Sequence, residues 1–274
     1  APLATDRPDL VQGVRDAFDR AGFDAQRIPG RLGGDSMDKL TFGPLDRPKH
    51  LWRTREGDPL ATLIRLFLIG VPVDPAAFER AVAPMAIDDW RTLGLVESDH
   101  RGIHRAVAIR PSGPLLMAYD HALPGEGQRY DHVLGVSGTT RFLANATVRR
   151  HARRTLDLGT GGGYQALIAA PHSDLVLGTD RNPRAIVFAR FNAQLNGIAN
   201  VEFATGDLFE PVHGLLFDLI VANPPFVVSP DHQLQFRDSG LKGDEISEKI
   251  VRAVPQYLEE GGRAQLLCSW VRFA

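Results

Sequence analysis

The feature that most constrains the fold is a glycine-rich turn between a short apolar strand and an apolar helix, within residues 155–170. The strand ends at Asp157, four glycines follow within residues 159–163, and the helix begins near Tyr164. Glycine lets a backbone turn sharply and approach a ligand closely, and the first turn of a helix offers free N–H groups to an anion. A dinucleotide-binding fingerprint that starts at Gly159 requires a glycine where the chain has Tyr164. The segment predicts a ligand-binding turn, with a generic nucleotide-binding or purely structural turn as alternatives.

Short apolar strands and helices alternate through the second half of the chain. We expect strands over 155–157, 175–179, 201–204, 218–222 and 263–271, and helices over 163–170, 183–196 and 244–258. Continuous apolar strands are typical of parallel strands that are buried on both faces. Right-handed crossovers then give a doubly wound α/β sheet that binds its ligand at the carboxyl edge. Gly261 and Gly262 are expected to precede the last strand.

Acidic residues follow the ends of three successive predicted strands. They are Asp157, Asp180 and Asp207. A carboxylate at the end of the second strand suits a ribose diol, because it accepts hydrogen bonds from two hydroxyl groups. Each aspartate alone is explained more simply as a helix cap, but three in order indicate a binding edge.

The fourth predicted strand leads into Asn223, Pro224, Pro225 and Phe226. Two prolines fix the chain and lack N–H groups, so nearby carbonyl oxygens remain free to accept hydrogen bonds. The Asn223 side-chain oxygen and the Pro224 carbonyl could each accept one N–H of a planar NH2 group. Phe226 could lie against the flat face of that group. A proline-stiffened loop with no chemical role is the simpler alternative.

Together these segments resemble the class I S-adenosylmethionine-dependent methyltransferases, over roughly residues 131–271. The Asn-Pro-Pro-Phe motif is similar to that of enzymes that methylate adenine N6, guanine N2 or a glutamine side-chain amide. Its extension, Val-Val-Ser-Pro, looks most like the release-factor glutamine methyltransferase group. Phenylalanine in the motif's last position is common in the ribosomal-RNA methyltransferases.

The resemblance implies a Rossmann-like methyltransferase fold with S-adenosyl-L-methionine as cofactor and a catalytic motif at Asn223, Pro224, Pro225 and Phe226. It implies that Asp180 holds the ribose, Asp207 the adenine, and the turn from Gly159 to Gly163 the methionine end. The full set of implied cofactor neighbours is Asp157, Gly159, Thr160, Gly161, Asp180, Arg181, Asp207, Leu208 and Asn223. Gly138 and Thr139 join this set because the segment before the first strand closes over the cofactor in that group.

The first half of the chain predicts a smaller, mainly helical domain over residues 1–128, followed by the methyltransferase domain over 129–274. We expect helices over 7–21, 35–41, 58–70, 74–83 and 87–93, and strands over 50–54, 95–97, 103–109 and 114–119. Three helices followed by a hairpin is the order of a winged helix. Its recognition helix would contain Asp88 and Asp89 and only Arg91, which suits phosphate contacts poorly and favours a packing domain.

Composition limits the class of protein. The net charge is −2, hydrophobic residues make up 43% of the chain, and the longest apolar stretch is interrupted by Arg65. We therefore expect a cytoplasmic protein without a membrane span or a globally basic surface. The single cysteine, Cys268, excludes an internal disulfide and a cysteine metal cluster, and we expect it in a buried strand. His100 and His104 are interpreted as solvated.

The densest basic cluster of the chain lies just before the first predicted strand of the second domain. Its members are Arg149, Arg150, His151, Arg153 and Arg154. We expect a helix to continue to about His151, so that these charges sit at a helix C-terminus, where they are favourable. A phosphate-binding patch is the alternative.

Two questions of function remain open in the sequence. The acceptor could be a release-factor-like protein or a nucleic acid such as rRNA, tRNA or DNA. The chain could also be a winged-helix regulator with a methyltransferase-like sensor domain, or an NAD-type oxidoreductase. An intact Asn-Pro-Pro-Phe motif argues against the first rival, and the glycine spacing argues against the second.

The last predicted strand, 263–271, would lie at an open edge of the sheet with unpaired backbone groups, which natural proteins avoid. We therefore expect residues beyond Ala274, or a partner strand, to cover it. Pairing with an N-terminal strand is a less favoured alternative.

Overall fold

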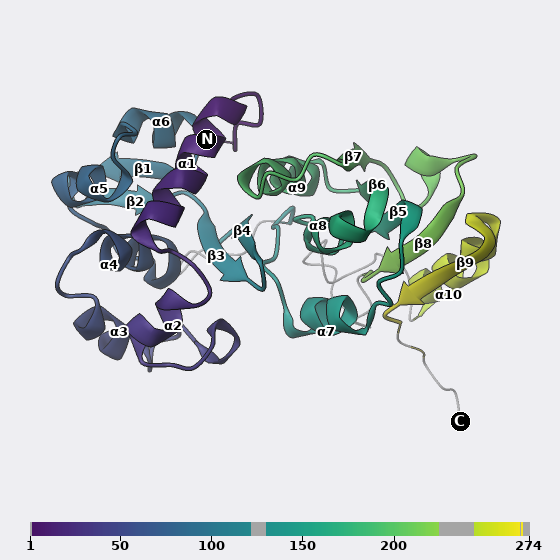
Figure 1. Cartoon of the computed structure of the whole chain (residues 1–274), viewed down its shortest axis with the longest axis horizontal. Coiled ribbons are helices and arrows are strands. Elements are labelled where there is room, and N and C mark those ends of the chain that lie inside the picture. Colours follow the sequence, from purple (N-terminus) through teal and green to yellow (C-terminus); the bar gives the residue numbers. More distant parts are fainter. Residues whose placement is uncertain (1, 122–129, 225–243, 269, 271–274) are drawn as a thin grey trace. The chain divides into compact units, whose positions relative to one another are not determined.

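The computed structural model of the chain describes residues 2–121, 130–224, 244–268 and 270 (Figure 1). The chain divides into two compact units. One comprises residues 1–121 with 194–197, and the other comprises residues 122–193 with 198–274. The predicted boundary between residues 128 and 129, together with Pro225 and Phe226, lies outside the described residues.

The helices of the N-terminal unit begin and end at the capping signals in the sequence. Helix α1 (Pro8–Ala21) ends at Gly22, whose φ of 71° is left-handed, and no side chain caps its N-terminus. The expected helix over 58–70 is α4 (Pro59–Leu63) followed by a π-helical segment, η2 (Ile64–Ile69). The carboxylates of Asp58 and Asp74 cap α4 and α5 by accepting a backbone N–H, each at 3.0 Å. Helices α5 (Pro75–Val82) and α6 (Ile87–Thr92) confirm the remaining two predictions.

Three predictions between residues 23 and 57 are wrong or incomplete. The strand predicted over 50–54 is helix α3 (Arg47–Arg53), because His50 and Thr54 are buried at helical rather than alternating spacing. The helix predicted over 35–41 is only the short 3₁₀ helix η1 (Met37–Lys39). Helix α2 (Arg27–Leu32) is an additional element that ends at the left-handed Gly33.

Two antiparallel hairpins follow the helices. Strand β1 (Val96–Asp99) pairs with β2 (Gly102–Arg105), and β3 (Ala108–Ser112) pairs with β4 (Leu115–Tyr119). The single strand predicted over 103–109 is therefore divided between two separate sheets. His104 is not a simple solvated residue, because its Nε2 lies 2.6 Å from Asp99 Oδ1. The unit's core contains a cluster of aromatic rings: Phe18, Phe23, Phe67, Phe78 and Trp90.

The second unit is built on a five-stranded parallel sheet in the order β7-β6-β5-β8-β9 (Figure 1). The strands are β5 (Ala152–Leu158), β6 (Ser173–Asp180), β7 (Val201–Thr205), β8 (Phe217–Ala222) and β9 (Leu258–Leu266). Between them run α8 (Tyr164–Ala169), the 3₁₀ turn η3 (Ala170–His172), α9 (Pro183–Leu195), the 3₁₀ turn η4 (Glu210–Val212), α10 (Glu245–Ala253) and the 3₁₀ turn η5 (Val254–Gln256). This confirms the predicted doubly wound α/β sheet, with the strand order reversing between β5 and β8.

The last strand begins five residues earlier than predicted. The sequence predicts a glycine break before a strand over 263–271, whereas Gly261 and Gly262 lie inside β9 (Leu258–Leu266). There the pairing with β8 shifts register between Phe217 and Leu219, and Gly261 has a φ of 75°. A Cβ on Gly262 would lie 2.9 Å from the Phe217 carbonyl oxygen, so the glycine pair makes an irregularity within the strand. The helix predicted over 244–258 is correspondingly shorter, because α10 ends at Ala253 and η5 follows.

Strand β9 pairs with β8 and with no other strand of the described residues. Cys268 lies beyond the end of β9 and is partly exposed, so its predicted place in a buried strand is wrong. Within the described residues, no helix has the length and apolar character needed to cross a membrane.

The basic cluster at 149–154 does not sit at a helix C-terminus as predicted. Helix α7 (Gly138–Ala146) ends before it, and β5 already begins at Ala152. Several of its charges instead face acids, since His151 Nε2 lies 2.8 Å from Asp174 and Arg153 lies 3.6 Å from both Asp218 and Glu259.

Candidate functional site

The strand register of the parallel sheet places the predicted site residues at one edge. Asp157 is paired with Gly178 of β6 and Val221 of β8, one residue before the end of β5. Asp180 ends β6 and Asn223 follows β8 directly, while Asp207 comes two residues after β7. The carboxyl ends of four neighbouring strands therefore bring these side chains to a common edge.

Asp157 is a buried support of the glycine turn. Its side chain is 1% exposed, and Oδ2 accepts hydrogen bonds from the Thr160 hydroxyl at 2.6 Å and the Ala166 N–H at 2.9 Å. The latter bond satisfies a free donor in the first turn of α8. Asp157 therefore ties the turn to the strand that precedes it and to the helix that follows.

The glycine turn leaves space at its surface. Gly159 and Gly161 have φ values of 74° and 54°, and a Cβ added to either would meet no atom within 4 Å. Left-handed backbone is the conformation that favours glycine, and the empty space beside it allows a ligand to approach the backbone. Gly163 differs, because its Cβ would lie 3.2 Å from Ala189 Cβ, so that glycine permits close packing instead.

Asp180 links the end of β6 to the glycine turn. Its Oδ2 accepts the Gly161 N–H at 2.8 Å and its Oδ1 accepts the Asn182 N–H at 2.9 Å. The amide of Asn182 in turn donates to the Asp131 carbonyl at 3.0 Å, and Arg181 lies 3.3 Å from the Tyr130 hydroxyl. The segment that begins at residue 130 therefore lies against the end of β6, which is the position expected for a segment that closes over a ligand.

The end of β7 combines exposure with strained backbone. Asp207 is exposed, and its N–H donates to Glu210 Oε2 at 3.3 Å. Leu208 has a φ of 45°, and among the described residues it is the one non-glycine residue with left-handed backbone. Such strain costs about 1–3 kcal/mol and is concentrated at functional sites. It favours the predicted role of this pair at a binding edge.

Asn223 has one partner and one free acceptor. Its Nδ2 donates to the Thr140 hydroxyl at 3.3 Å, while its buried Oδ1 has no hydrogen-bond partner among the described residues. A buried acceptor without a partner destabilises the protein by about 1–3 kcal/mol, so it indicates a place for a donor that comes from a ligand. Pro224 is buried directly beside it.

Thr140 connects three elements at this point and was not among the predicted site residues. It lies in the first turn of α7, where the Ser137 hydroxyl accepts its N–H at 3.1 Å. Its own hydroxyl accepts from Asn223, and its carbonyl accepts from Gln165 of α8 at 2.8 Å. The serine cap at 137 is the one sequence signal that could have located this helix start. The predicted neighbours Gly138 and Thr139 are both exposed in the same turn.

The environment of the carboxylates perturbs their protonation. Burial raises the pKa of Asp157 to about 7, and the charge of Asp180 adds to this, although the Thr160 and Ala166 hydrogen bonds oppose it. Burial likewise raises the pKa of Asp180, against the bonds from Asn182 and Gly161. Perturbed carboxylates that meet at the end of a sheet are typical of functional sites.

The role of Thr140 gives a first testable prediction. Thr140→Val removes the hydroxyl that orients the Asn223 amide and preserves the shape of the side chain. We expect a decrease in kcat of about threefold to tenfold, the effect of one hydrogen bond, with unchanged cofactor affinity. Steady-state kinetics and calorimetry of the variant measure both, and Thr140→Ser should restore wild-type kcat. Loss of cofactor affinity with unchanged kcat would contradict the role.

Comparisons with known proteins agree with this geometry. Residues 135–269 match the methyltransferase small domain family, and residues 20–107 match a domain of unknown function. Over 139 residues the chain is 37% identical to a release factor glutamine methyltransferase of Geobacter sulfurreducens, covering 45% of the chain and 48% of that protein. It is also 37% identical over 121 residues to a putative protein N5-glutamine methyltransferase of Methanocaldococcus jannaschii, covering 42% of the chain and 60% of that protein. The chain spans about half the length of the curated relatives it matches.

The residues at the sheet edge fit S-adenosylmethionine, the cofactor of this family. Space lies open beside Gly159 and Gly161, and the carboxylate of Asp180 lies at the end of β6 beside them. No group of histidine, cysteine and acidic side chains in the described residues could hold a metal ion.

Proposed function

We propose that residues 135–269, which match the methyltransferase small domain family, form an S-adenosylmethionine-dependent methyltransferase domain that methylates the side-chain amide nitrogen of glutamine in a protein. This proposal rests mainly on the buried Oδ1 of Asn223 beside Pro224, which has no hydrogen-bond partner among the residues that the structure describes. An acceptor in that position suits an N–H of a planar NH2 group. In this proposal residues 129–274 are the catalytic domain and residues 1–128 an accessory domain.

The proposed cofactor contacts follow the strand ends. Asp180 holds the ribose, Asp207 and Leu208 face the adenine, and the turn that contains Gly159, Thr160 and Gly161 faces the methionine end. Asp157 supports that turn from beneath through its bonds to Thr160 and Ala166. Arg181 lies at the same end of β6, next to Tyr130.

The cofactor supplies an electrophilic methyl group attached to a sulfonium, so the protein must position the acceptor nitrogen. The Asn223 oxygen accepts one N–H of the amide and the Pro224 carbonyl accepts the other. This aligns the nitrogen with the methyl carbon, and orientation of this kind supplies up to roughly 7–11 kcal/mol in the best cases. The two oxygens would favour the positive charge that develops on the nitrogen as it takes the methyl group from sulfur, which would leave as a neutral thioether, and solvent would take up the amide proton that is lost. Thr140 fixes the Asn223 amide through its hydroxyl.

Two features favour glutamine over a nucleobase amine. One is the Val-Val-Ser-Pro extension after Phe226, and the other is the pair of relatives named for glutamine methylation. A nucleobase NH2 presents similar N–H geometry, so the acceptor has to be tested directly.

The test uses methyl-labelled S-adenosylmethionine and a release factor as acceptor, with a matched acceptor in which the modified glutamine is replaced by glutamate. We expect label on the wild-type acceptor and none on the glutamate form, because a carboxylate offers no N–H to Asn223. Equal labelling of both acceptors would exclude glutamine methylation. Transfer to RNA or DNA alone would assign the nucleobase alternative.

A second prediction concerns the cofactor. Asp180→Ala should weaken S-adenosylmethionine binding by about 1–3 kcal/mol, the range for hydrogen bonds that involve a charged group. Isothermal titration calorimetry measures the dissociation constant, with NAD as the competing cofactor that should not bind. Asp174→Ala is the matched control, because Asp174 is an exposed aspartate at the opposite end of the same strand. An Asp180 variant with the wild-type dissociation constant would remove this residue from the cofactor site.

A further inference from the structure

Helix α3 of the N-terminal unit presents a basic and aromatic surface that the proposed methyl-transfer site does not use. The run from Arg47 to Arg55 contains four arginine and lysine residues and no acidic residue. It also contains Trp52, which is 63% exposed although tryptophan is usually buried. An exposed tryptophan among basic residues requires a physical explanation.

The inner face of α3 fixes the helix in place. His50 and Thr54 are buried, with the Thr54 hydroxyl donating to the His50 carbonyl at 2.8 Å and His50 Nε2 lying 2.9 Å from the Thr41 carbonyl. Arg53 donates to the Leu32 carbonyl and is therefore committed to the fold. The helix is anchored from one side, so its other side is presented rigidly.

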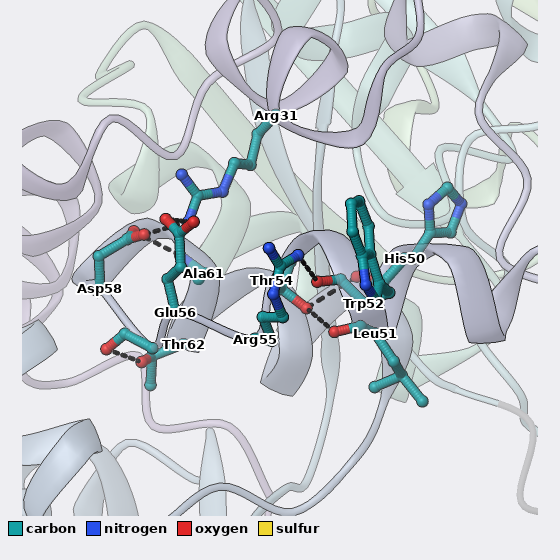
Figure 2. A network of polar contacts seen from close by, with 11 residues as sticks. Arg31, His50, Leu51, Trp52, Thr54, Arg55, Glu56, Asp58, Ala61 and Thr62 are labelled. Atoms are coloured by element: carbon teal, nitrogen blue, oxygen red, sulfur yellow. Dashed lines mark hydrogen bonds and ion pairs between the residues drawn. The ribbon is translucent and has the colours of Figure 1, made fainter.

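The outer face combines cations with the indole ring. Lys49 and Trp52 are three residues apart and lie on one side of the helix. The Arg55 guanidinium lies 4.1 Å from the centroid of the Trp52 ring and donates to the Trp52 carbonyl at 2.9 Å (Figure 2). Arg47 and Lys49 are exposed and form no ion pair with the described residues.

In the part of the chain that the structure describes, the neighbouring acids form no ion pair with Arg47, Lys49 or Arg55. Glu56 and Asp58 both pair with Arg31, the former at 3.4 Å (Figure 2). Asp46, just before the helix, accepts a hydrogen bond from the Thr41 hydroxyl. Positive charge is therefore concentrated beside an exposed aromatic ring.

We propose that this α3 surface, formed by Arg47, Lys49, Trp52 and Arg55, binds a single-stranded segment of nucleic acid. Phosphates contact the cations, and an unpaired base stacks on the indole. A partner protein is less favoured, because three exposed cations complement a polyanion and the site includes an aromatic ring on which a base can stack. The winged-helix order pointed to α6 as the recognition helix, but the first turn of that helix contains the exposed Asp88 and the half-buried Asp89, which repel phosphate.

The test measures binding of short, labelled single-stranded RNA to the full chain by fluorescence anisotropy at several salt concentrations. Trp52→Ala should weaken binding roughly 5- to 150-fold, the effect of losing one stacked base, and Trp52→Phe should retain most of the affinity. Lys49→Gln should reduce the salt slope of log K by about 0.7, the value for one phosphate contact on a single strand. Arg80→Gln removes another exposed cation, on α5, and should change neither quantity.

Three results would overturn the proposal: no binding by the wild type at low salt, wild-type binding by Trp52→Ala, or equal loss in Arg80→Gln. Binding of single-stranded DNA with the same dependence on Trp52 supports it, because the stacking ring and cations do not read the sugar. If a release factor binds instead and Trp52→Ala abolishes that binding, the surface belongs to a protein partner and the proposal is wrong. Thermal unfolding curves of all variants should match the wild type, since the changed side chains are exposed. None of these measurements depends on methyl transfer.

Discussion

Replacing Asn223 with alanine is expected to reduce kcat by at least about 100-fold, the loss that misplacement of a reacting group produces. The variant lacks the buried Oδ1, which has no hydrogen-bond partner among the described residues, and the Nδ2 that donates to the Thr140 hydroxyl. The acceptor nitrogen then has only the Pro224 carbonyl to orient it. The dissociation constant for S-adenosylmethionine should be nearly unchanged, because the proposed ribose and adenine contacts come from β6 and β7.

The matched control for this variant is Asn145→Ala, which removes an exposed asparagine from α7. It should keep wild-type kcat and cofactor affinity. Single-turnover kinetics with the acceptor that the wild type methylates separates the chemical step from product release. A wild-type single-turnover rate in Asn223→Ala would rule out the proposed alignment of the acceptor nitrogen.

A large effect on stability is expected at Asp157. Burial raises the pKa of its carboxyl in the folded protein to about 7, whereas the ordinary value is 3.8. Between these two pKa values, the Asp157 carboxyl is protonated in the folded state and ionised in the unfolded state. The free energy of unfolding therefore falls as the pH rises from about 4 to 7, and it is constant above that. The whole change is on the order of 4 kcal/mol, because each unit of pKa corresponds to about 1.4 kcal/mol.

Asp157→Asn removes this titration and keeps an oxygen that can accept from Thr160 and Ala166. Relative to the wild type, the variant should therefore gain about 3 kcal/mol of unfolding free energy between pH 5 and pH 8. Urea unfolding at a series of pH values measures this free energy. The transition to follow is the one that shifts when S-adenosylmethionine is added, because it reports the unit that contains Asp157. Asp180 is present in both proteins, so the difference between the two profiles reports the Asp157 carboxyl together with its coupling to Asp180. Asp174→Asn should follow the wild-type profile, and parallel profiles for Asp157→Asn and the wild type would contradict the buried, protonated carboxyl.

The sequence predicts the methyltransferase sheet well because each strand is a continuous apolar run that ends in a recognisable residue. Asp180 and Asn223 sit where strand order alone places them, and the left-handed glycines at 159 and 161 follow from the turn that the strand and helix require. These features are local, so periodicity and turn chemistry suffice to predict them.

The wrong or missing predictions concern segments whose structure depends on contacts with residues far away in the sequence. Helix α3 was predicted as a strand because its burial depends on Thr41 and Leu32, which contact it from outside the segment. Strand β9 begins earlier than predicted because pairing with β8 accommodates Gly261 and Gly262 within a strand. The contact between Thr140 and Asn223 joins residues 83 positions apart. No local sequence pattern predicts such a pair.

Glutamine methylation is tested most directly by supplying methyl-labelled S-adenosylmethionine to the full chain, with release factors, ribosomes, tRNA and DNA side by side. Tandem mass spectrometry then locates the label. We expect label in the release factor, on the side-chain nitrogen of a glutamine, and its loss with Asn223→Ala. Label on a carbon or oxygen atom, or undiminished labelling by Asn223→Ala, would contradict it.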